Sequence, residues 1–344
     1  MAEKRPKVVV FGAGMIGLYV GGLLARHADV RFIGRPSMLD PLSEGLKLTD
    51  ADGLDLELKP DDFQRSMEPQ ALADAELVLV TTKSMATGDA ADAIARHAPE
   101  RALIVSLQNG VSNIALLRER LPGRTVLAGM VPFNVAQRTP HHFHRGTGGG
   151  LMVEKSEALS AYEKLFSTSS IPLQTRDDMP GVQWGKLLVN LNNAVNALSG
   201  VSLAEQLRQR DYRRAWALSL KEGLALLKAA GIEPVDAIAM PLKLMPQIMS
   251  LPDSIYFYVV AAAGGAKVRV DPHARSSMAD DLARGRATEV DYLQGELVRL
   301  AERLGRSAPV NAHMVRLVKA AEKGAQPLSA KELYAELKAA ARRR

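Results

Sequence analysis

Residues Lys7–His27 read KVVVFGAGMIGLYVGGLLARH, and this segment permits two incompatible interpretations. It carries no charged residue between Val8 and Ala25, and the segment MAEKRPK before it is basic. That combination is typical of a signal peptide or a short membrane anchor. The same residues also spell a β-branched strand, a glycine turn and a helix. The first interpretation predicts an exported or anchored protein, and the second predicts a cytoplasmic enzyme.

The glycine turn favours the second interpretation. Its residues fit G-x-G-x-x-G after an apolar strand, Val8–Phe11, and before a helix that runs to about Arg26, with a second strand at Val30–Ile33. In this motif the first glycine allows a tight turn, the second admits a pyrophosphate, and the third lets the helix pack closely. Free N–H groups and the helix dipole then hold the phosphates. We therefore expect a dinucleotide to bind Gly12, Ala13, Gly14, Met15, Ile16 and Gly17.

Composition bounds the class of protein. A chain of 344 residues suits two domains, and its 47% hydrophobic and 24% charged residues are ordinary for a soluble globular protein. The net charge of +6 comes partly from basic termini, which we interpret as solvated tails and not as a nucleic-acid surface. The chain has no cysteine, which excludes disulfides and thiolate chemistry. Beyond residue 27 no apolar run is long enough to span a membrane, and Val259–Ala266 is expected to be a short buried helix or loop.

The first part of the chain alternates apolar strands with helices. This pattern predicts parallel strands buried on both faces of a doubly wound sheet. After Asp177-Asp178-Met179-Pro180 helical periodicity takes over. We predict an α/β fold, with an N-terminal Rossmann-like doubly wound domain over residues 1–177, including the glycine-rich loop 146–150, and an all-α C-terminal domain over residues 178–344. The expected strands are Leu77–Thr81, Leu103–Leu107 and Thr125–Gly129, and the expected helices are Met85–Arg96, Ile114–Leu121, Gln183–Leu198, Tyr212–Ala230, Glu289–Leu304 and Met314–Lys323.

The residue after the second strand distinguishes the two nicotinamide cofactors. NAD enzymes place an acid there for the ribose hydroxyls, whereas this chain has Gly34 followed by Arg35. An arginine without a competing acid suits the 2′-phosphate of NADP. The sequence therefore predicts NADP(H), and the alternative is that Arg35 is an ordinary solvated surface residue.

Further polar residues occur where a substrate would approach. Thr81-Thr82-Lys83 and Gln108-Asn109-Gly110 each end a predicted parallel strand, at the edge of the sheet where ligands bind. The segment WGKLLVN places Lys186 and Asn190 four residues apart, on one face of a helix. A lysine that faces a cofactor loses hydration, which lowers its pKa toward a value useful for general acid catalysis.

These motifs occur in a characteristic order. With Ser276-Ser277-Met278 and Arg286-Ala287-Thr288-Glu289 they make the chain resemble the ketopantoate reductase (2-dehydropantoate 2-reductase) family over nearly its whole length. The resemblance implies reduction of a 2-keto acid by hydride transfer from NADPH, in a cleft between two domains. It also implies formation of pantoate for the coenzyme A pathway, with no nucleic acid or membrane as partner.

The resemblance also assigns roles to single residues. Lys186 matches the lysine that protonates the carbonyl oxygen, Asn109 matches the asparagine near the nicotinamide and substrate, and Glu289 matches the acid that orients the cofactor and the lysine. Asn190 and Ser277 match residues that bind the substrate, the serine at its carboxylate. The implied cofactor contacts outside the glycine turn are Arg35, Lys83, Asn109, Ala136 and Glu289.

Ordinary structural roles remain as alternatives. Lys186 also fits a surface lysine, Asn109 a simple turn, and Ser277 with Asp280 and Thr288 with Asp291 fit capping boxes. The histidines of the segment HHFH (residues 141–144) lack nearby acids, so we expect a loop–strand edge and no metal site.

One departure from the family bears on the substrate. The family's second substrate asparagine falls on Ala194, and on a continuous helix Asn192, Asn193 and Asn196 point elsewhere. The exact keto acid therefore stays open. A paralogous reductase of another 2-keto acid and an NADP-binding regulatory protein without turnover are the alternatives. The sequence leaves domain closure and the oligomeric state open as well, with a homodimer among the options.

Overall fold

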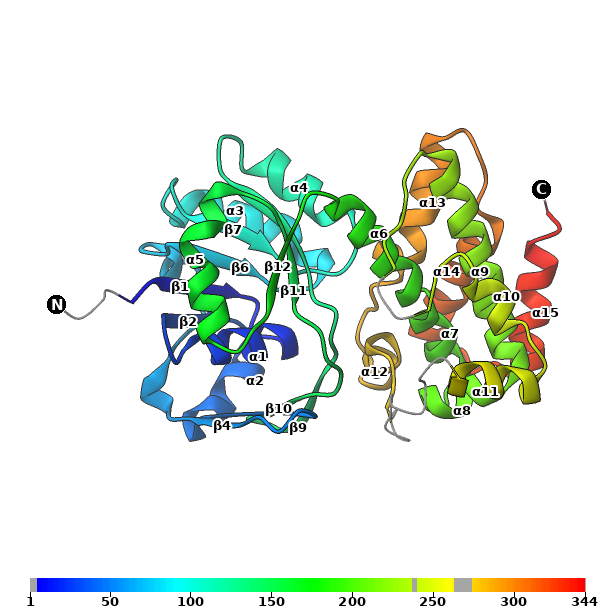
Figure 1. Cartoon of the computed structure of the whole chain (residues 1–344), viewed down its shortest axis with the longest axis horizontal. Coiled ribbons are helices and arrows are strands. Elements are labelled where there is room, and N and C mark those ends of the chain that lie inside the picture. The colour runs from blue at the N-terminus through cyan, green and yellow to red at the C-terminus, as the bar shows by residue number, and fades with distance from the viewer. Residues whose placement is uncertain (1–4, 237–239, 263–273, 344) are drawn as a thin grey trace. The chain divides into compact units, whose positions relative to one another are not determined.

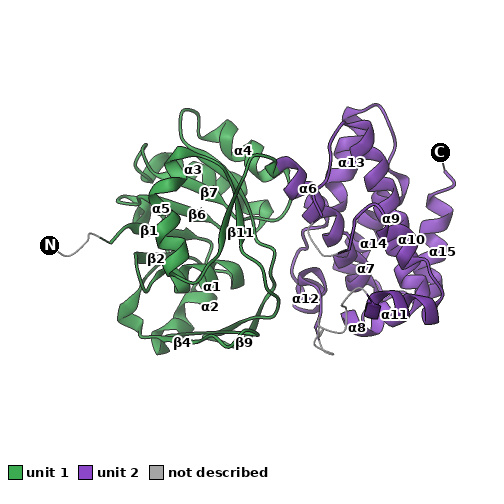
Figure 2. Cartoon of the chain, in the orientation of Figure 1, with its two compact units in different colours: residues 1–179 green, residues 180–344 purple. Residues whose placement is uncertain are grey.

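The computed structural model describes residues 5–236, 240–262 and 274–343. Contacts divide the chain into two compact units, residues 1–179 and 180–344 (Figure 2). The first combines sheets with helices and the second is helical, as the predicted fold class requires (Figure 1). The division falls two residues after the boundary expected from the sequence. Lys4, Arg344 and the end of the apolar stretch 259–266 lie outside the described residues.

Unit 1 is built on an eight-stranded sheet. The strands from β8 to β5 run parallel, and β11 pairs with β8 in the antiparallel sense. Every residue of β6, β7 and β8 is buried, which explains their continuous apolar sequences. The order of the strands reverses between β1 and β6, and such a switch point is where ligands bind. Across the sheet the strands are β12 (Leu173–Arg176), β11 (Leu151–Glu154), β8 (Val126–Met130), β7 (Leu103–Ser106), β6 (Leu77–Val80), β1 (Lys7–Phe11), β2 (Asp29–Ile33) and β5 (Gln64–Ser66).

Helices cover both faces of this sheet. On one face, Val8 and Val10 of β1 point into a core that they form with two of the helices. On the opposite face, Val9 points into a second core that contains the other two helices. This alternation is the period of two that a strand imposes on its side chains. The helices on the first face are α1 (Met15–Leu24) and α5 (Glu157–Thr168), and those on the second are α3 (Thr87–His97) and α4 (Ser112–Arg120).

A second, four-stranded sheet in unit 1 was not predicted. Leu46, Leu48 and Phe143 of this sheet pack on the α1 side of the first core, so α1 lies between the two sheets. His141 lies in a turn and the strand that follows begins at His142, so this segment is at the junction of a loop and a strand, as expected. The strand itself is paired on both sides. In order the strands are β4 (Asp55–Leu58), β3 (Leu46–Asp50), β10 (His142–Arg145) and β9 (Val135–Thr139).

Unit 2 is a bundle of helices around α9. The long α9 packs against α7, α10, α13, α14 and α15. No helix of the residues that the structure describes is long and apolar enough to cross a membrane. The helices are α6 (Met179–Asn190), α7 (Asn192–Ser199), α8 (Leu203–Arg208), α9 (Arg210–Ala229), α10 (Met245–Met249), α11 (Asp253–Ala262), α12 (Ser277–Ala283), α13 (Gln294–Arg303), α14 (Pro309–Glu322) and α15 (Ala330–Ala340).

Two helices predicted as continuous are broken, so those predictions were wrong in extent. The first ends at Asn190 and resumes at Asn192. The buried Gln294 donates its Nε2 hydrogen to the carbonyl of Leu191 at 2.8 Å, and a side chain inserted into the helical hydrogen-bond ladder bends or breaks a helix. The stretch predicted from Glu289 consists of the 3₁₀ helix Val290–Tyr292 followed by α13.

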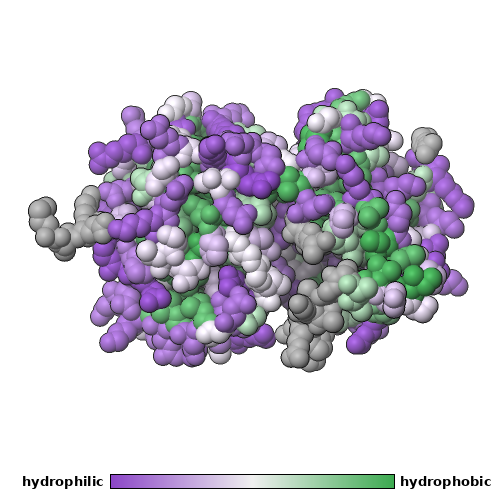
Figure 3. Space-filling model, viewed as in Figure 1, coloured by the Kyte–Doolittle hydropathy of each residue, from purple (hydrophilic) through white to green (hydrophobic). Residues whose placement is uncertain are grey.

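The visible surface is mostly hydrophilic (Figure 3). Apolar residues gather on unit 2 around α10 and α11. The exposed large apolar side chains in this part of the chain are Leu244, Ile255, Phe257 and Tyr258.

Candidate functional site

The glycine turn has a conformation that few other residues allow. Gly12 has a φ of +117°, and a Cβ there would lie 2.5 Å from the amide nitrogen of Thr82. A Cβ on Gly17 would lie 2.4 Å from the carbonyl oxygen of Gly12. The amides of Gly12 and Ala13 donate to the carbonyl of Ile33 at 2.9 and 3.0 Å. The first and third glycines are therefore required by close packing between β1, β2, β6 and α1.

The middle glycine lies in a different environment. A Cβ on Gly14 would meet no atom within 4 Å, and α1 begins at the next residue, Met15. The first N–H groups of a helix have no partner within the helix. Open space over such a helix N-terminus fits a pyrophosphate, which accepts these hydrogen bonds and interacts favourably with the dipole.

The loops that follow β6 and β7 lie beside this turn. Thr81 donates its hydroxyl hydrogen to the carbonyl of Gly12 at 2.7 Å. Gln108 Nε2 donates to the carbonyl and the hydroxyl oxygens of Thr82 at 3.1 and 3.2 Å. The structure thus brings together the glycine turn and the loops that carry Lys83, which is half-buried, and Asn109, which is exposed.

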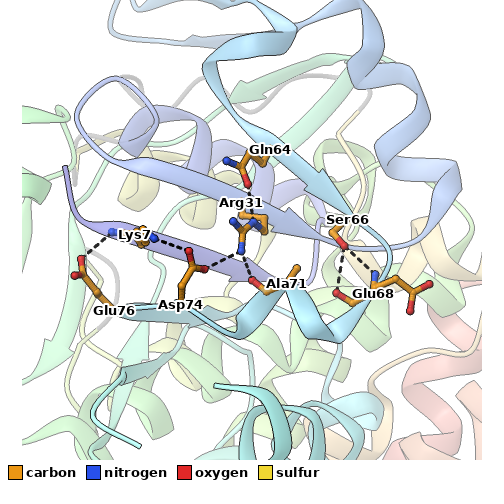
Figure 4. Close-up of polar contacts among 8 residues, drawn as sticks. All are labelled: Lys7, Arg31, Gln64, Ser66, Glu68, Ala71, Asp74 and Glu76. Atoms are coloured by element: carbon orange, nitrogen blue, oxygen red, sulfur yellow. Dashed lines mark hydrogen bonds and ion pairs between the residues drawn. The ribbon is translucent and has the colours of Figure 1, made fainter. Parts of the chain in front are cut away.

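Arg35 is exposed directly after β2. Its guanidinium forms no hydrogen bond or ion pair with any residue that the structure describes. The strand before it is held in place by polar contacts that Figure 4 draws. Arg31 of this strand donates hydrogen bonds to Asp74 at 3.0 Å and to Gln64 at 2.8 Å. Gly34 donates its amide hydrogen to the carbonyl of Ser66, so the end of β2 is also held by β5. A rigid strand end with an exposed guanidinium suits recognition of a phosphate.

The remaining candidate of unit 1 lies elsewhere. Ala136 is exposed on β9 of the smaller sheet, where it pairs with His144. It is therefore not part of the loops that follow the strands of the larger sheet.

In unit 2, close packing fixes the helix that carries Lys186. A Cβ on Gly185 would lie 1.9 Å from the carbonyl oxygen of Val235, and one on Gly181 would lie 2.6 Å from that of Glu233. The amide of Val235 donates to the carbonyl of Gly181 at 2.9 Å. Two glycines four residues apart thus give α6 a smooth face for this segment. The W-G-K sequence places Lys186 directly after the tighter of these two contacts.

The electrostatics of Lys186 are unusual for a lysine. Loss of hydration is the cause that lowers its pKa from 10.5 to about 8. Its ammonium forms no hydrogen bond or ion pair with a residue of the described ranges. A poorly hydrated ammonium without a counter-ion releases its proton readily, which is the property of a general acid near neutral pH. Asn190 lies one turn further along α6 and is half-buried.

The asparagines around Ala194 lie in different environments. Ala194 is fully buried, so the position that the family resemblance singled out does not face open space. Asn192 accepts a hydrogen bond from Gln206 at 2.6 Å, and Asn196 accepts one from the amide of Ser276 at 2.8 Å. Asn193 is the half-buried residue of this group. Leu191 keeps helical dihedrals and its amide still donates to the carbonyl of Leu187 at 3.0 Å. Residue 193 lies seven residues after Lys186 and three after Asn190, and these spacings share one face of a helix, so the expectation that Asn193 points elsewhere was wrong.

The expected capping boxes are wrong. Ser276, and not Ser277, caps α12, because its hydroxyl oxygen accepts from the amide of Ala279 at 3.1 Å. Ser277 is exposed at the first position of that helix. Thr288 donates its hydroxyl hydrogen to Glu322 at 2.7 Å and not to Asp291. Ser277 therefore has no capping role.

Glu289 is half-buried between Thr288 and the 3₁₀ helix Val290–Tyr292. The main-chain amide of Thr288 also donates to Glu322, at 2.9 Å, so the backbone that carries Glu289 is tied to the end of α14. Across the described ranges, no group of three or more histidine, aspartate or glutamate side chains is arranged to hold a metal ion.

Comparisons with known proteins cover both units. Residues 8–157 match the family model described as Ketopantoate reductase PanE/ApbA, and residues 178–322 match the one described as Ketopantoate reductase PanE/ApbA C terminal. The 2-dehydropantoate 2-reductase of Halobacterium salinarum is 28% identical, over 92% of this chain and 99% of the relative. That of Pyrococcus horikoshii is 27% identical, over 92% and 97%. The crystal structure of a PanE/ApbA family ketopantoate reductase from Ralstonia eutropha JMP134 has a TM-score of 0.76 at 30% identity, over 92% of this chain and 98% of the other.

Proposed function

The chain belongs to the ketopantoate reductase family, which makes it an oxidoreductase, and from this premise we propose that it reduces 2-dehydropantoate to pantoate with NADPH. The observation that carries the proposal is Lys186. Lys186 is half-buried and its ammonium is poorly hydrated, with no partner among the described residues, which is costly for a charged group. The chain places it on α6, one helical turn from a second polar side chain. A structural lysine has no need of that environment, whereas a proton donor does.

The bound nicotinamide would supply a hydride to the keto carbon. Lys186 gives the proton that the carbonyl oxygen takes up, so that a 2-hydroxy acid forms and the amine regains its proton from water. While charged, the ammonium also stabilises the negative charge that develops on this oxygen. With a pKa of about 8 the lysine is mostly protonated at neutral pH and still a good acid. Asn109 and Glu289 are proposed to orient the nicotinamide end of the cofactor and the lysine.

The cofactor-binding part of the proposal rests on unit 1. The open space above Gly14 accepts the pyrophosphate, and the exposed Arg35 binds the 2′-phosphate, which favours NADPH over NADH. Lys83, between β6 and α3, adds a positive charge for the phosphates or the ribose. The contact proposed for Ala136 is the least supported of the set, because Ala136 lies on the smaller sheet.

The substrate-binding part rests on unit 2. Asn190 and Ser277 are proposed to hold the keto acid, with Ser277 at its carboxylate. A second candidate function, reduction of a different 2-keto acid, is favoured by the buried Ala194, because an alanine at this position offers no amide to a substrate and Asn193 is the half-buried asparagine beside it. A site built to hydrogen-bond a substrate hydroxyl discriminates strongly against substrates that leave its amide unpaired.

We also propose that the protein is located in the cytoplasm, acts in the coenzyme A pathway, and functions as a monomer or a homodimer. A regulatory protein that binds NADP without turnover is the remaining alternative. Sensing a dinucleotide requires no proton donor, so the pKa of Lys186 argues against that role.

A panel of 2-keto acids, each tested with NADPH and with NADH, checks the proposal. We expect oxidation of NADPH with 2-dehydropantoate as the best substrate, and a markedly lower kcat/KM with NADH. Turnover of another keto acid in preference to 2-dehydropantoate would support the second candidate. Binding of NADPH without oxidation across the whole panel would contradict both and favour the regulatory protein.

A further inference from the structure

A group of buried polar side chains lies beneath the loops that follow β6 and β7. Its members have side chains at most 8% exposed, and most of their hydrogen bonds are to one another or to the two loops. The apolar residues of α3 and α4 nearby, such as Ala90 and Leu117, show that this face of the sheet is otherwise filled by aliphatic packing. The five members are Ser84, Thr87, Ser106, Gln108 and Asn113.

Gln108 joins the first loop to α3. Its Nε2 donates to the hydroxyl of Thr87 at 2.8 Å as well as to Thr82, and its Oε1 accepts from Ser106 at 3.1 Å. The hydroxyl of Thr87 in turn donates to the carbonyl of Ser84 at 2.8 Å. The main chain on either side of Lys83 is thereby tied at Thr82 and at Ser84.

Asn113 and Ser84 fix the second loop. Asn113 Nδ2 donates to the carbonyl of Asn109 at 2.5 Å and to the hydroxyl of Ser84 at 2.9 Å. The Ser84 hydroxyl lies 3.2 Å from the same Asn109 carbonyl, and the Thr87 hydroxyl lies 3.0 Å from Asn113 Oδ1. Thr87 therefore contacts residues that bond the loop after β6 and a residue that bonds the loop after β7.

We propose that Thr87, together with Asn113, is a positioning residue that sets the separation between the main chains of Lys83 and Asn109 and thereby the alignment of the bound NADPH. The inference rests on the proposed function, because it takes both residues to be cofactor contacts. The network bonds the main-chain carbonyls of Thr82, Ser84 and Asn109. It therefore fixes the backbone from which the side chains of Lys83 and Asn109 extend, and it does so without contacting the cofactor.

Physical reasons favour this role over simple packing. Filling the same space with aliphatic side chains would avoid the cost of burying five polar groups. A fully bonded network, in contrast, has one arrangement and holds the groups that it bonds rigidly. Small displacements of groups that contact a reacting cofactor have large effects on binding and rate.

Titration of NADPH with the purified protein, without any keto acid, tests the inference. Thr87→Val keeps the shape of the side chain and removes the hydroxyl, whereas Thr87→Ser keeps the hydroxyl. We expect the Kd for NADPH to rise roughly tenfold in Thr87→Val, because the lost hydroxyl leaves buried partners unpaired, and to stay within about threefold of the wild type in Thr87→Ser.

Ser219→Ala is the matched control. Ser219 is a fully buried hydroxyl of unit 2 that bonds Asn311 at 2.6 Å, far in the sequence from any proposed cofactor contact. Ser219→Ala should lower the melting temperature about as much as Thr87→Val does and leave the Kd for NADPH unchanged. If Thr87→Val fails to fold, Ser84→Ala removes a smaller part of the same network and should also raise the Kd.

The outcomes separate the two claims. A wild-type protein that does not bind NADPH overturns the proposed function and this inference with it. Normal binding by the wild type, together with an unchanged Kd in the folded Thr87→Val or Ser84→Ala variant, overturns the inference alone. A raised Kd that Thr87→Ser also shows contradicts a role for the hydroxyl.

Discussion

Replacing Lys186 by methionine should abolish function and stabilise the protein. The pKa of this lysine is lowered from 10.5 to about 8 by loss of hydration. A change of one in pKa corresponds to about 1.4 kcal/mol, so the charged ammonium costs the native state about 3 kcal/mol at pH 7. Methionine has a similar length and no charge. We therefore expect Lys186→Met to raise the free energy of unfolding by up to about 3 kcal/mol at pH 7.

The pH dependence of this stability difference shows whether the lost hydration of the Lys186 ammonium causes it. The folded pKa lies below the unfolded value, so below pH 8 both states are protonated and the cost is fully present. Between pH 8 and pH 10.5 the native amine loses its proton first, and the stability of the wild type rises relative to the variant. The advantage of Lys186→Met should therefore shrink steadily over this window.

Urea unfolding followed by circular dichroism, at several pH values from 7 to about 10, measures this difference. Lys221→Met, at an exposed lysine of α9, is the control and should change stability by no more than about 0.5 kcal/mol without a pH trend. Equal or lower stability of Lys186→Met at neutral pH, or a difference that does not shrink as the pH rises, would show that the Lys186 ammonium does not destabilise the native state.

Three further predictions concern binding. Gly14→Ala should leave the melting temperature unchanged, because its Cβ meets no protein atom within 4 Å, but should raise the Kd for NADPH at least tenfold by occupying space for the pyrophosphate; an unchanged Kd would contradict the phosphate site. Arg35→Ala should raise the KM for NADPH about tenfold or more and leave that for NADH nearly unchanged, and equal losses for both cofactors would argue against a 2′-phosphate contact. Asn193→Ala should raise the KM for the keto acid about tenfold with the KM for NADPH unchanged, whereas wild-type kinetics would exclude this amide from the substrate site.

The larger sheet was predictable because its signals are local. Strands such as β6 and β7 are apolar throughout, as parallel strands buried on both faces must be. The smaller sheet was missed because its strands carry many polar residues, for example HFHR in β10. Its two pairs of neighbouring strands, β3 with β4 and β9 with β10, are joined into one sheet by the pairing of β3 with β10, which are distant in the sequence.

In the candidate site, too, local sequence patterns were predictable and contacts between distant residues were not. The glycine turn was predicted from its spacing between a strand and a helix, and Lys186 from the resemblance of the WGKLLVN segment to the ketopantoate reductase family. The hydrogen bond from Gln294 to the carbonyl of Leu191 joins residues that are 103 positions apart, and no local pattern predicts it. The glycines at 181 and 185 carried a readable signal, because two glycines four residues apart mark a helix face that another segment approaches closely.

Steady-state oxidation of NADPH with 2-dehydropantoate, compared between the wild type and Lys186→Met across pH, tests the central claim most directly. We expect turnover by the wild type, a kcat/KM that falls as the pH rises past about 8, and a kcat at least about 100-fold lower in the variant. Wild-type turnover by the folded Lys186→Met variant would contradict the assignment of this lysine as the proton donor.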